Sequence, residues 1–242
     1  MKMQSAYFLS NFTQGDQRIT LDDKESHHAI SVRRVKLGEK VYVTNGEGLV
    51  AAGEVVSINK KLEVEVHNFE QISKTKKQIT VLQAVLKGDR SDFAVELMSE
   101  VGVSQIAFWS ADRSVARIEA KSEKVLQRWQ HLAAAATKQS RQAWLPKISY
   151  CRGIEEAIEL LKGHQEIYLL DYEAKDALSI AHESSRILFI VGPEGGLTEG
   201  EKSIFTSHGA KSINIGKTVL RGSTAGAVAA AVAFNLARSQ ND

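Results

Sequence analysis

Two glycine-rich corners have the residue types and spacing of a ligand site. The first, GPEGG at Gly192 to Gly196, follows the apolar run ILFIV and precedes a helix start. The second, INIGKTVLRGSTAG, runs from Ile213 to Gly226 and again joins a strand-like segment to a helix-like one. Glycines let the backbone approach a ligand closely, and Pro193 restricts its own backbone angle. We therefore expect the corners to form two walls of one pocket, because ligands bind at strand ends in open α/β sheets.

Neither corner has the GxxxxGK[ST] or GxGxxG spacing of the common nucleotide-phosphate loops. The expected pocket therefore suits a ligand held by backbone groups and apolar contacts, such as an adenosine moiety without a polyphosphate. An unidentified small ligand fits the same pattern, and so does an ordinary tight turn from strand to helix. Thr198 and Glu201 have the spacing of a capping box, which accounts for the helix start but leaves the glycines unexplained.

Composition favours a soluble cytoplasmic protein. The 242 residues are 43% hydrophobic, and the lone Cys151 provides neither a disulfide framework nor a cysteine cluster for zinc. No apolar run approaches the roughly 18 residues that suggest a membrane span. The net charge of only +2 does not by itself indicate a nucleic-acid partner. The basic clusters Arg33-Arg34-x-Lys36 and Lys74-x-Lys76-Lys77 are more telling, although solvated cations on surface turns fit them about as well.

The polar, basic stretch QISKTKK, residues 71–77, separates two patterns. Residues 1–73 contain short β segments, a hairpin signal in NGEG at 45–48, and one helix over DDKESHHAISVRRV, which together predict a small barrel-like domain. Residues 74–242 alternate helices with strands that read as continuous apolar runs. This second pattern is typical of an α/β fold with a parallel sheet covered on both faces.

The motif LFIVGPEGGLTEGE followed by INIGKTVLRGSTAG resembles the paired motifs of the SPOUT-type RNA methyltransferases. More closely, it is similar to the 16S ribosomal RNA (uracil-N3)-methyltransferase family. SHHAISVRRVKLGEKVYVTNGEG and LKGDRSDFAVELMSEVGVSQIAFWSADRSV resemble that family's N-terminal and central segments, so the resemblance covers nearly the whole chain. It implies a PUA-like β-barrel domain for RNA, followed by a SPOUT methyltransferase domain with a deep trefoil knot over about residues 187–230.

The resemblance also implies S-adenosyl-L-methionine as co-substrate, no metal, a homodimer, and methylation of N3 of a specific uridine in 16S ribosomal RNA of the small ribosomal subunit. Arg221 would be catalytic, binding a phosphate or the base, or countering the charge of a deprotonated uracil; a salt bridge that supports the knot is its structural alternative. The cofactor would contact Leu170, Gly192, Pro193, Glu194, Gly195, Gly196, Ile215, Gly216, Val219, Leu220 and Thr224. The RNA would contact His28, Arg33, Arg34, Lys36, Arg113 and Arg141.

Some positions depart from the family pattern. After Leu220-Arg221 the family commonly continues Thr-Glu-Thr, whereas this chain has Gly222-Ser223-Thr224 and so lacks a carboxylate. Leu97 and Lys138 stand where a lysine and a glutamate are common, and Arg141-Gln142 is out of step with the usual arginine position. Three interpretations follow: a ribosomal RNA uridine methyltransferase, a knotted methyltransferase acting on another RNA nucleotide, or a catalytically impaired RNA-binding paralogue.

Overall fold

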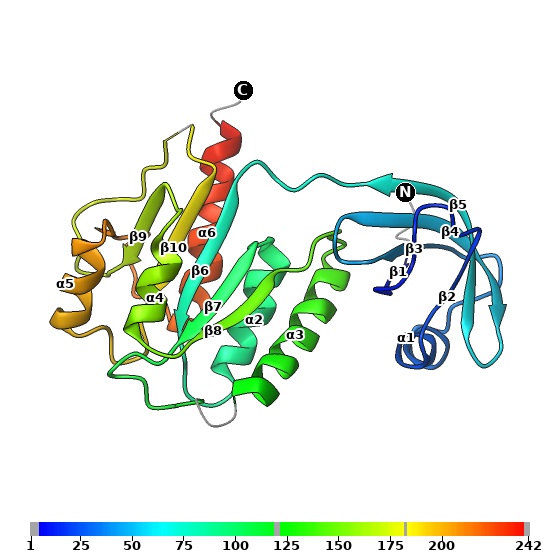
Figure 1. Cartoon of the computed structure of the whole chain (residues 1–242), viewed down its shortest axis with the longest axis horizontal. Coiled ribbons are helices and arrows are strands. Elements are labelled where there is room, and N and C mark those ends of the chain that lie inside the picture. Colours follow the sequence, from blue (N-terminus) through cyan, green and yellow to red (C-terminus); the bar gives the residue numbers. More distant parts are fainter. Residues whose placement is uncertain (1–4, 119–121, 182, 240–242) are drawn as a thin grey trace. The chain divides into compact units, whose positions relative to one another are not determined.

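The computed structural model describes residues 5–118, 122–181 and 183–239 and divides into two compact units (Figure 1). The first unit comprises residues 1–74 and 137–145, and the second comprises residues 75–136 and 146–242. The segment 137–145 therefore groups with the N-terminal residues, which differs from a single boundary after residue 73. Main-chain hydrogen bonds account for this grouping, because Gly48 donates to the Ala143 carbonyl and Leu145 donates to the Gly46 carbonyl, both at 2.9 Å.

The first unit contains a five-stranded sheet in the order β1-β3-β4-β5-β2. Its predicted hairpin is confirmed, since β3 and β4 pair antiparallel around the turn at 45–48. The Asn45 side-chain oxygen accepts the Glu47 and Leu49 N–H groups, and Gly46 and Gly48 adopt φ values of 76° and 93°. Its elements are β1 (Ser5–Phe8), β2 (Arg18–Thr20), α1 (Asp23–His27), the π-helical turn η1 (His28–Val32), β3 (Lys40–Thr44), β4 (Leu49–Ile58) and β5 (Leu62–Gln71).

The second unit contains a six-stranded sheet in the order β11-β9-β10-β6-β7-β8, and every strand pair in it is parallel. The predicted parallel α/β sheet is thus confirmed. Its elements are β6 (Gln78–Ala84), α2 (Arg90–Val101), β7 (Gln105–Trp109), most of α3 (Ser122–Gln139), β8 (Lys147–Cys151), α4 (Ile154–Leu161), β9 (Glu166–Leu170), β10 (Arg186–Val191), α5 (Glu199–Ser207), β11 (Lys211–Ile213) and α6 (Gly222–Ser239).

Helices cover both faces of this sheet, as Figure 1 shows. In β10, Phe189 and Val191 belong to a core shared with α2, α3 and α6, whereas Leu188 and Ile190 belong to a core shared with α4 and α5. Alternate side chains point to opposite faces of a strand, so a strand buried on both sides reads as a continuous apolar run.

The small residues of α6 serve packing within the second unit. A Cβ added to Gly226 would lie 3.0 Å from the Met98 sulfur of α2 and 3.0 Å from a Val81 methyl of β6. The neighbouring Ala229 and Ala230 are fully buried. Close packing of α6 against α2 and β6 therefore accounts for the small residues Gly226, Ala229 and Ala230.

None of the helices within residues 5–118, 122–181 and 183–239 is long and apolar enough to cross a membrane. Within the same part of the chain, no group of three or more His, Cys, Asp or Glu side chains is arranged to hold a metal ion.

Candidate active site at the carboxyl ends of three parallel strands

A cavity of about 640 Å³ lies where three neighbouring strands end. Strands β11, β9 and β10 are adjacent and parallel, so their carboxyl ends meet at one edge of the sheet. Leu170, Val191 and Ile213 are the last residues of β9, β10 and β11, and all three line the cavity. The cavity is within the size range of small-molecule sites.

The first glycine corner forms one wall of the cavity. Gly192, Pro193, Glu194 and Gly196 line it, and the Gly196 N–H donates to the Pro193 carbonyl at 2.9 Å. Gly196 has a φ of 70°, in the left-handed region that favours glycine. The tight turn therefore needs this residue type.

A capping box starts the helix that follows the corner. The Thr198 hydroxyl accepts the Glu201 N–H at 3.2 Å, and Glu201 Oε2 accepts the Thr198 N–H at 2.7 Å. Glu201 is only 4% exposed, and its Oε1 also accepts the Asp112 N–H at 2.8 Å. The predicted capping box is confirmed, and its glutamate also ties α5 to the loop after β7.

The second glycine corner forms the opposite wall. Ile215, Val219, Leu220 and Arg221 line the cavity, and Val219 is 69% exposed. The two corners touch at the start of α6, where a Cβ added to Gly222 would lie 3.2 Å from the Gly192 carbonyl oxygen and 3.0 Å from Leu86 Cδ2. Since the missing side chain at Gly222 lets α6 approach the first corner, the departure from Thr-Glu-Thr has a packing consequence here.

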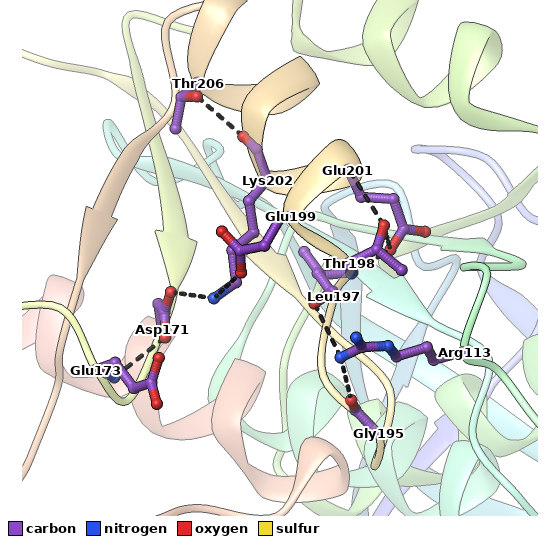
Figure 2. A network of polar contacts seen from close by, with 10 residues as sticks. All are labelled: Arg113, Asp171, Glu173, Gly195, Leu197, Thr198, Glu199, Glu201, Lys202 and Thr206. Atoms are coloured by element: carbon purple, nitrogen blue, oxygen red, sulfur yellow. Dashed lines mark hydrogen bonds and ion pairs between the residues drawn. The ribbon is translucent and has the colours of Figure 1, made fainter.

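Two ion pairs hold the walls, and neither was singled out from the sequence. Arg90 Nη1 lies 3.1 Å from Glu194 Oε1, which also accepts the Lys87 N–H at 3.2 Å. Lys202 Nζ lies 2.8 Å from Asp171 Oδ2 and 3.4 Å from a Glu199 oxygen (Figure 2).

Burial raises the pKa of the Asp171 carboxyl, but hydrogen bonds from Lys202 and the Glu173 N–H outweigh it, so the net shift is downward. Asp171 directly follows β9, which was the only sequence signal for its position. Lys202 carried no such signal, because its role depends on how α5 packs beside β9.

Arg113 also lies at this cavity. It follows β7 in the second unit, and its Nη1 donates to the carbonyls of Gly195 and Leu197 at 3.1 and 3.4 Å (Figure 2). These two bonds join Arg113 to the first glycine corner and to Leu197, the residue that follows it.

The structure brings most of the expected cofactor residues together. Gly195, Gly216 and Thr224 belong to the same corners but do not line the cavity, and the Thr224 hydroxyl instead donates to the Arg221 carbonyl at 3.1 Å. The expected residues that do line it are Leu170, Gly192, Pro193, Glu194, Gly196, Ile215, Val219, Leu220 and Arg221.

The remaining expected RNA contacts lie in the first unit. Arg33, Arg34 and Lys36 are exposed in the loop after η1, and Arg33 Nη2 donates to Gln139 Oε1 at 3.3 Å. This bond links the loop to the turn that carries Arg141, which is also exposed.

His28 is half-buried at the start of η1. Burial, followed by the nearby Lys138 ammonium, lowers the pKa of its imidazole. The ring is therefore held toward its neutral form, which can act as both donor and acceptor of hydrogen bonds.

Family comparisons agree with this architecture. A family model described as an RNA methyltransferase domain matches residues 73–234, and one described as an RNA methyltransferase PUA domain matches residues 21–66. The chain belongs to this family of RNA methyltransferases with an N-terminal PUA domain.

Curated relatives and solved structures give the same family. Ribosomal RNA small subunit methyltransferase E of Mycobacterium tuberculosis is 32% identical over 217 residues, which cover 86% of this chain and 83% of the relative. Ribosomal RNA small subunit methyltransferase E 2 of Borreliella burgdorferi is 28% identical over 240 residues, covering 92% and 93%. The structure of a Ribosomal RNA small subunit methyltransferase E from Neisseria gonorrhoeae bound to S-adenosyl methionine matches with a TM-score of 0.87 at 27% identity, covering 97% of this chain and 98% of that one.

Proposed function

We propose that this protein is an S-adenosyl-L-methionine-dependent methyltransferase that methylates N3 of a specific uridine in 16S ribosomal RNA of the small ribosomal subunit. The observation that carries the proposal is the cavity between two glycine corners, which lies within the matched RNA methyltransferase domain. The named relatives support the ribosomal RNA substrate, and the Neisseria gonorrhoeae structure supports the cofactor.

The residues of the cavity fit the proposed cofactor. S-Adenosylmethionine has no phosphate, and the wall at Gly192 to Gly196 offers main-chain groups rather than a phosphate loop. Leu220 and Ile215 are half-buried on the opposite wall, where they supply apolar surface for an adenine ring. We propose that the chain between the two corners threads through the trefoil knot expected of SPOUT methyltransferases.

The chain's own residues would position the uracil and stabilise its anion. When bound, S-adenosylmethionine supplies an electrophilic methyl group. Arg221 lines the cavity, and its guanidinium would stabilise the negative charge that develops when N3 of uracil loses its proton. A cation beside an acidic group lowers that group's pKa, so Arg221 favours the nucleophilic form of the base. Holding the reacting atoms in line supplies much of the remaining acceleration.

The first unit would bind the RNA backbone. Arg33, Arg34, Lys36 and Arg141 are exposed cations, and the PUA match over residues 21–66 supports an RNA role for the unit that contains them. A uracil paired within a duplex does not present N3 to a pocket, so the target would be an unpaired or flipped nucleotide. We propose that the protein acts in the cytoplasm as a homodimer.

Mapping of the methyl groups on 16S ribosomal RNA tests this function. Deletion of the gene should remove one N3-methyluridine, and the wild-type chain should restore it. Arg221→Ala should fail to restore the methyl group while still binding S-adenosylmethionine in calorimetry. Arg152→Ala is the matched control, because Arg152 is an exposed arginine that pairs with Glu156 and lies outside the cavity. Unchanged 16S methylation after deletion would overturn the ribosomal assignment.

A further inference from the structure

The loop that follows β7 holds the first glycine corner in place. Arg113 Nη1 donates to the Gly195 and Leu197 carbonyls, as Figure 2 shows. The aliphatic part of the same side chain packs on the glycine, because a Cβ added to Gly195 would lie 3.3 Å from Arg113 Cβ. One residue earlier, the Asp112 N–H donates to Glu201 at the start of α5. The loop therefore contacts both the corner and the helix that leaves it.

The loop after β6, together with the first residue of α2, holds the same corner at another point. Glu194 accepts hydrogen bonds from Arg90 and from the Lys87 N–H. In the sheet, β6 lies between β10 and β7, so the corner after β10 is fastened to the loops of the next two strands. Arg113 differs from the β6 loop in that it binds main-chain carbonyls rather than a carboxylate.

The hydrogen bonds from Arg113 to carbonyls matter because the proposed site recognises its ligand through main-chain groups. A glycine-rich loop has many accessible conformations and loses much entropy when it is ordered. A guanidinium that bridges two carbonyls on either side of Gly196 fixes the orientation of the peptide groups between them. This contact lowers the cost of binding by ordering the loop in advance.

We propose that Arg113 is a positioning residue that pre-orders the GPEGG corner for the cofactor, rather than an RNA contact. This inference rests on the proposed function, because it assigns the corner to S-adenosylmethionine. It predicts that loss of the guanidinium weakens cofactor binding and leaves the affinity of the first unit for RNA unchanged.

The test compares Arg113→Met and Arg113→Lys with Arg152→Met in the full chain. Methionine keeps an unbranched apolar side chain but removes the donors, whereas lysine keeps the charge and hydrogen-bond donors in a different geometry. Arg152 is an 82% exposed arginine of the same unit and serves as the matched control. Calorimetry measures S-adenosylmethionine affinity, fluorescence anisotropy measures affinity for a 16S ribosomal RNA transcript, and hydrogen–deuterium exchange reports on residues 192–198.

For Arg113→Met we expect a rise of roughly tenfold in the cofactor Kd, a matching rise in the KM for the cofactor, and an RNA Kd within about twofold of the wild type. Arg113→Lys should recover part of the loss, and Arg152→Met should change nothing. Deuterium uptake should increase at 192–198 and remain unchanged in the core strands, which separates this role from general destabilisation.

Two results would overturn the proposal. One is a loss of RNA affinity with unchanged cofactor affinity, which would make Arg113 an RNA contact. The other is unchanged exchange at 192–198. If the wild type itself binds no S-adenosylmethionine, the proposed function fails, but the exchange measurement still tests whether Arg113 orders the corner.

Discussion

Arg34 and Arg141 are the two non-glycine residues with positive φ among those the structure describes, at 53° and 58°. Both belong to the first unit, and both are exposed. The left-handed conformation costs an L-residue roughly 1–2 kcal/mol, and asparagine tolerates it better than arginine does. We predict that Arg34→Asn and Arg141→Asn each stabilise the protein and weaken its binding to RNA.

The expected gain follows from the backbone around the two residues. The hydrogen bonds that hold the turns are main-chain bonds, from the Val35 N–H to the Ala29 carbonyl and from the Arg141 N–H to the Lys138 carbonyl, both at 3.1 Å. Neither bond depends on the arginine side chains, so asparagine should recover about 0.5–1 kcal/mol at each position. For a chain of this size, that corresponds to a Tm increase of about 1–4 °C.

The expected loss of RNA binding follows from the charge. If each arginine contacts one phosphate of unpaired RNA, each substitution should reduce the slope of log K against log salt by about 0.7. Thermal unfolding and fluorescence anisotropy with a 16S transcript, between about 50 and 200 mM salt, measure the two effects. Arg18→Asn is the control, because Arg18 is an exposed arginine of the same unit, lies in β2 and pairs with Glu63 at 3.5 Å. A lower Tm would refute the strain argument, and a higher Tm with an unchanged salt slope would refute the RNA role.

Three further predictions concern other buried or paired groups. Lys138→Met removes the ammonium that lies 2.8 Å from Glu25 Oε1, and the Glu25 side chain is only 13% exposed. Urea titration should therefore show a loss of about 1–3 kcal/mol in the free energy of unfolding, which Glu25→Gln in the same chain largely restores. No loss would show that the pair contributes nothing to stability. Burial, and to a smaller extent the negative charge of Glu156, raises the pKa of the Cys151 thiol to about 11. A thiol reagent near pH 8 should therefore modify the folded protein far more slowly than the unfolded protein. Equal rates of modification would contradict this prediction. The folded-state pKa of Asp171 is lowered, so its carboxylate contributes stability above about pH 4, and this contribution is lost as the pH falls through the folded-state pKa. Asp171→Asn should therefore reduce the fall in the free energy of unfolding at acid pH. If the wild type and the variant lose stability in parallel as the pH falls, the effect is excluded.

Local chemistry made the glycine corners and most elements predictable. The run ILFIV predicted a buried strand, and Thr198 with Glu201 predicted the helix start, because both signals depend on neighbours within a few residues. Strands β1 and β8 were not predicted. β8 lies at an edge of its sheet and has an exposed and two half-buried residues among KISYC, so its sequence lacks a continuous apolar run.

The segment 137–145 shows a different limit of sequence reasoning. It begins within the last turn of α3, whose earlier residues belong to the second unit, yet it packs with the first unit through Trp144, whose Nε1 donates to the Ile72 carbonyl at 2.9 Å. Lys74 lies over the same ring, 4.5 Å from its centroid. Nothing within the segment encodes these partners, because the contacts join residues about seventy positions apart in the chain.

The sequence by itself determined which loops would line the cavity, because glycines, proline and a capping box act on their own local backbone. Only the tertiary structure decided which charged groups complete it. Lys202 reaches Asp171 because α5 packs beside β9, and Arg113 reaches the GPEGG corner because β7 lies two strands from β10 in the sheet. The order of strands in a sheet is set by packing between distant segments, so no spacing in the sequence specifies these pairs.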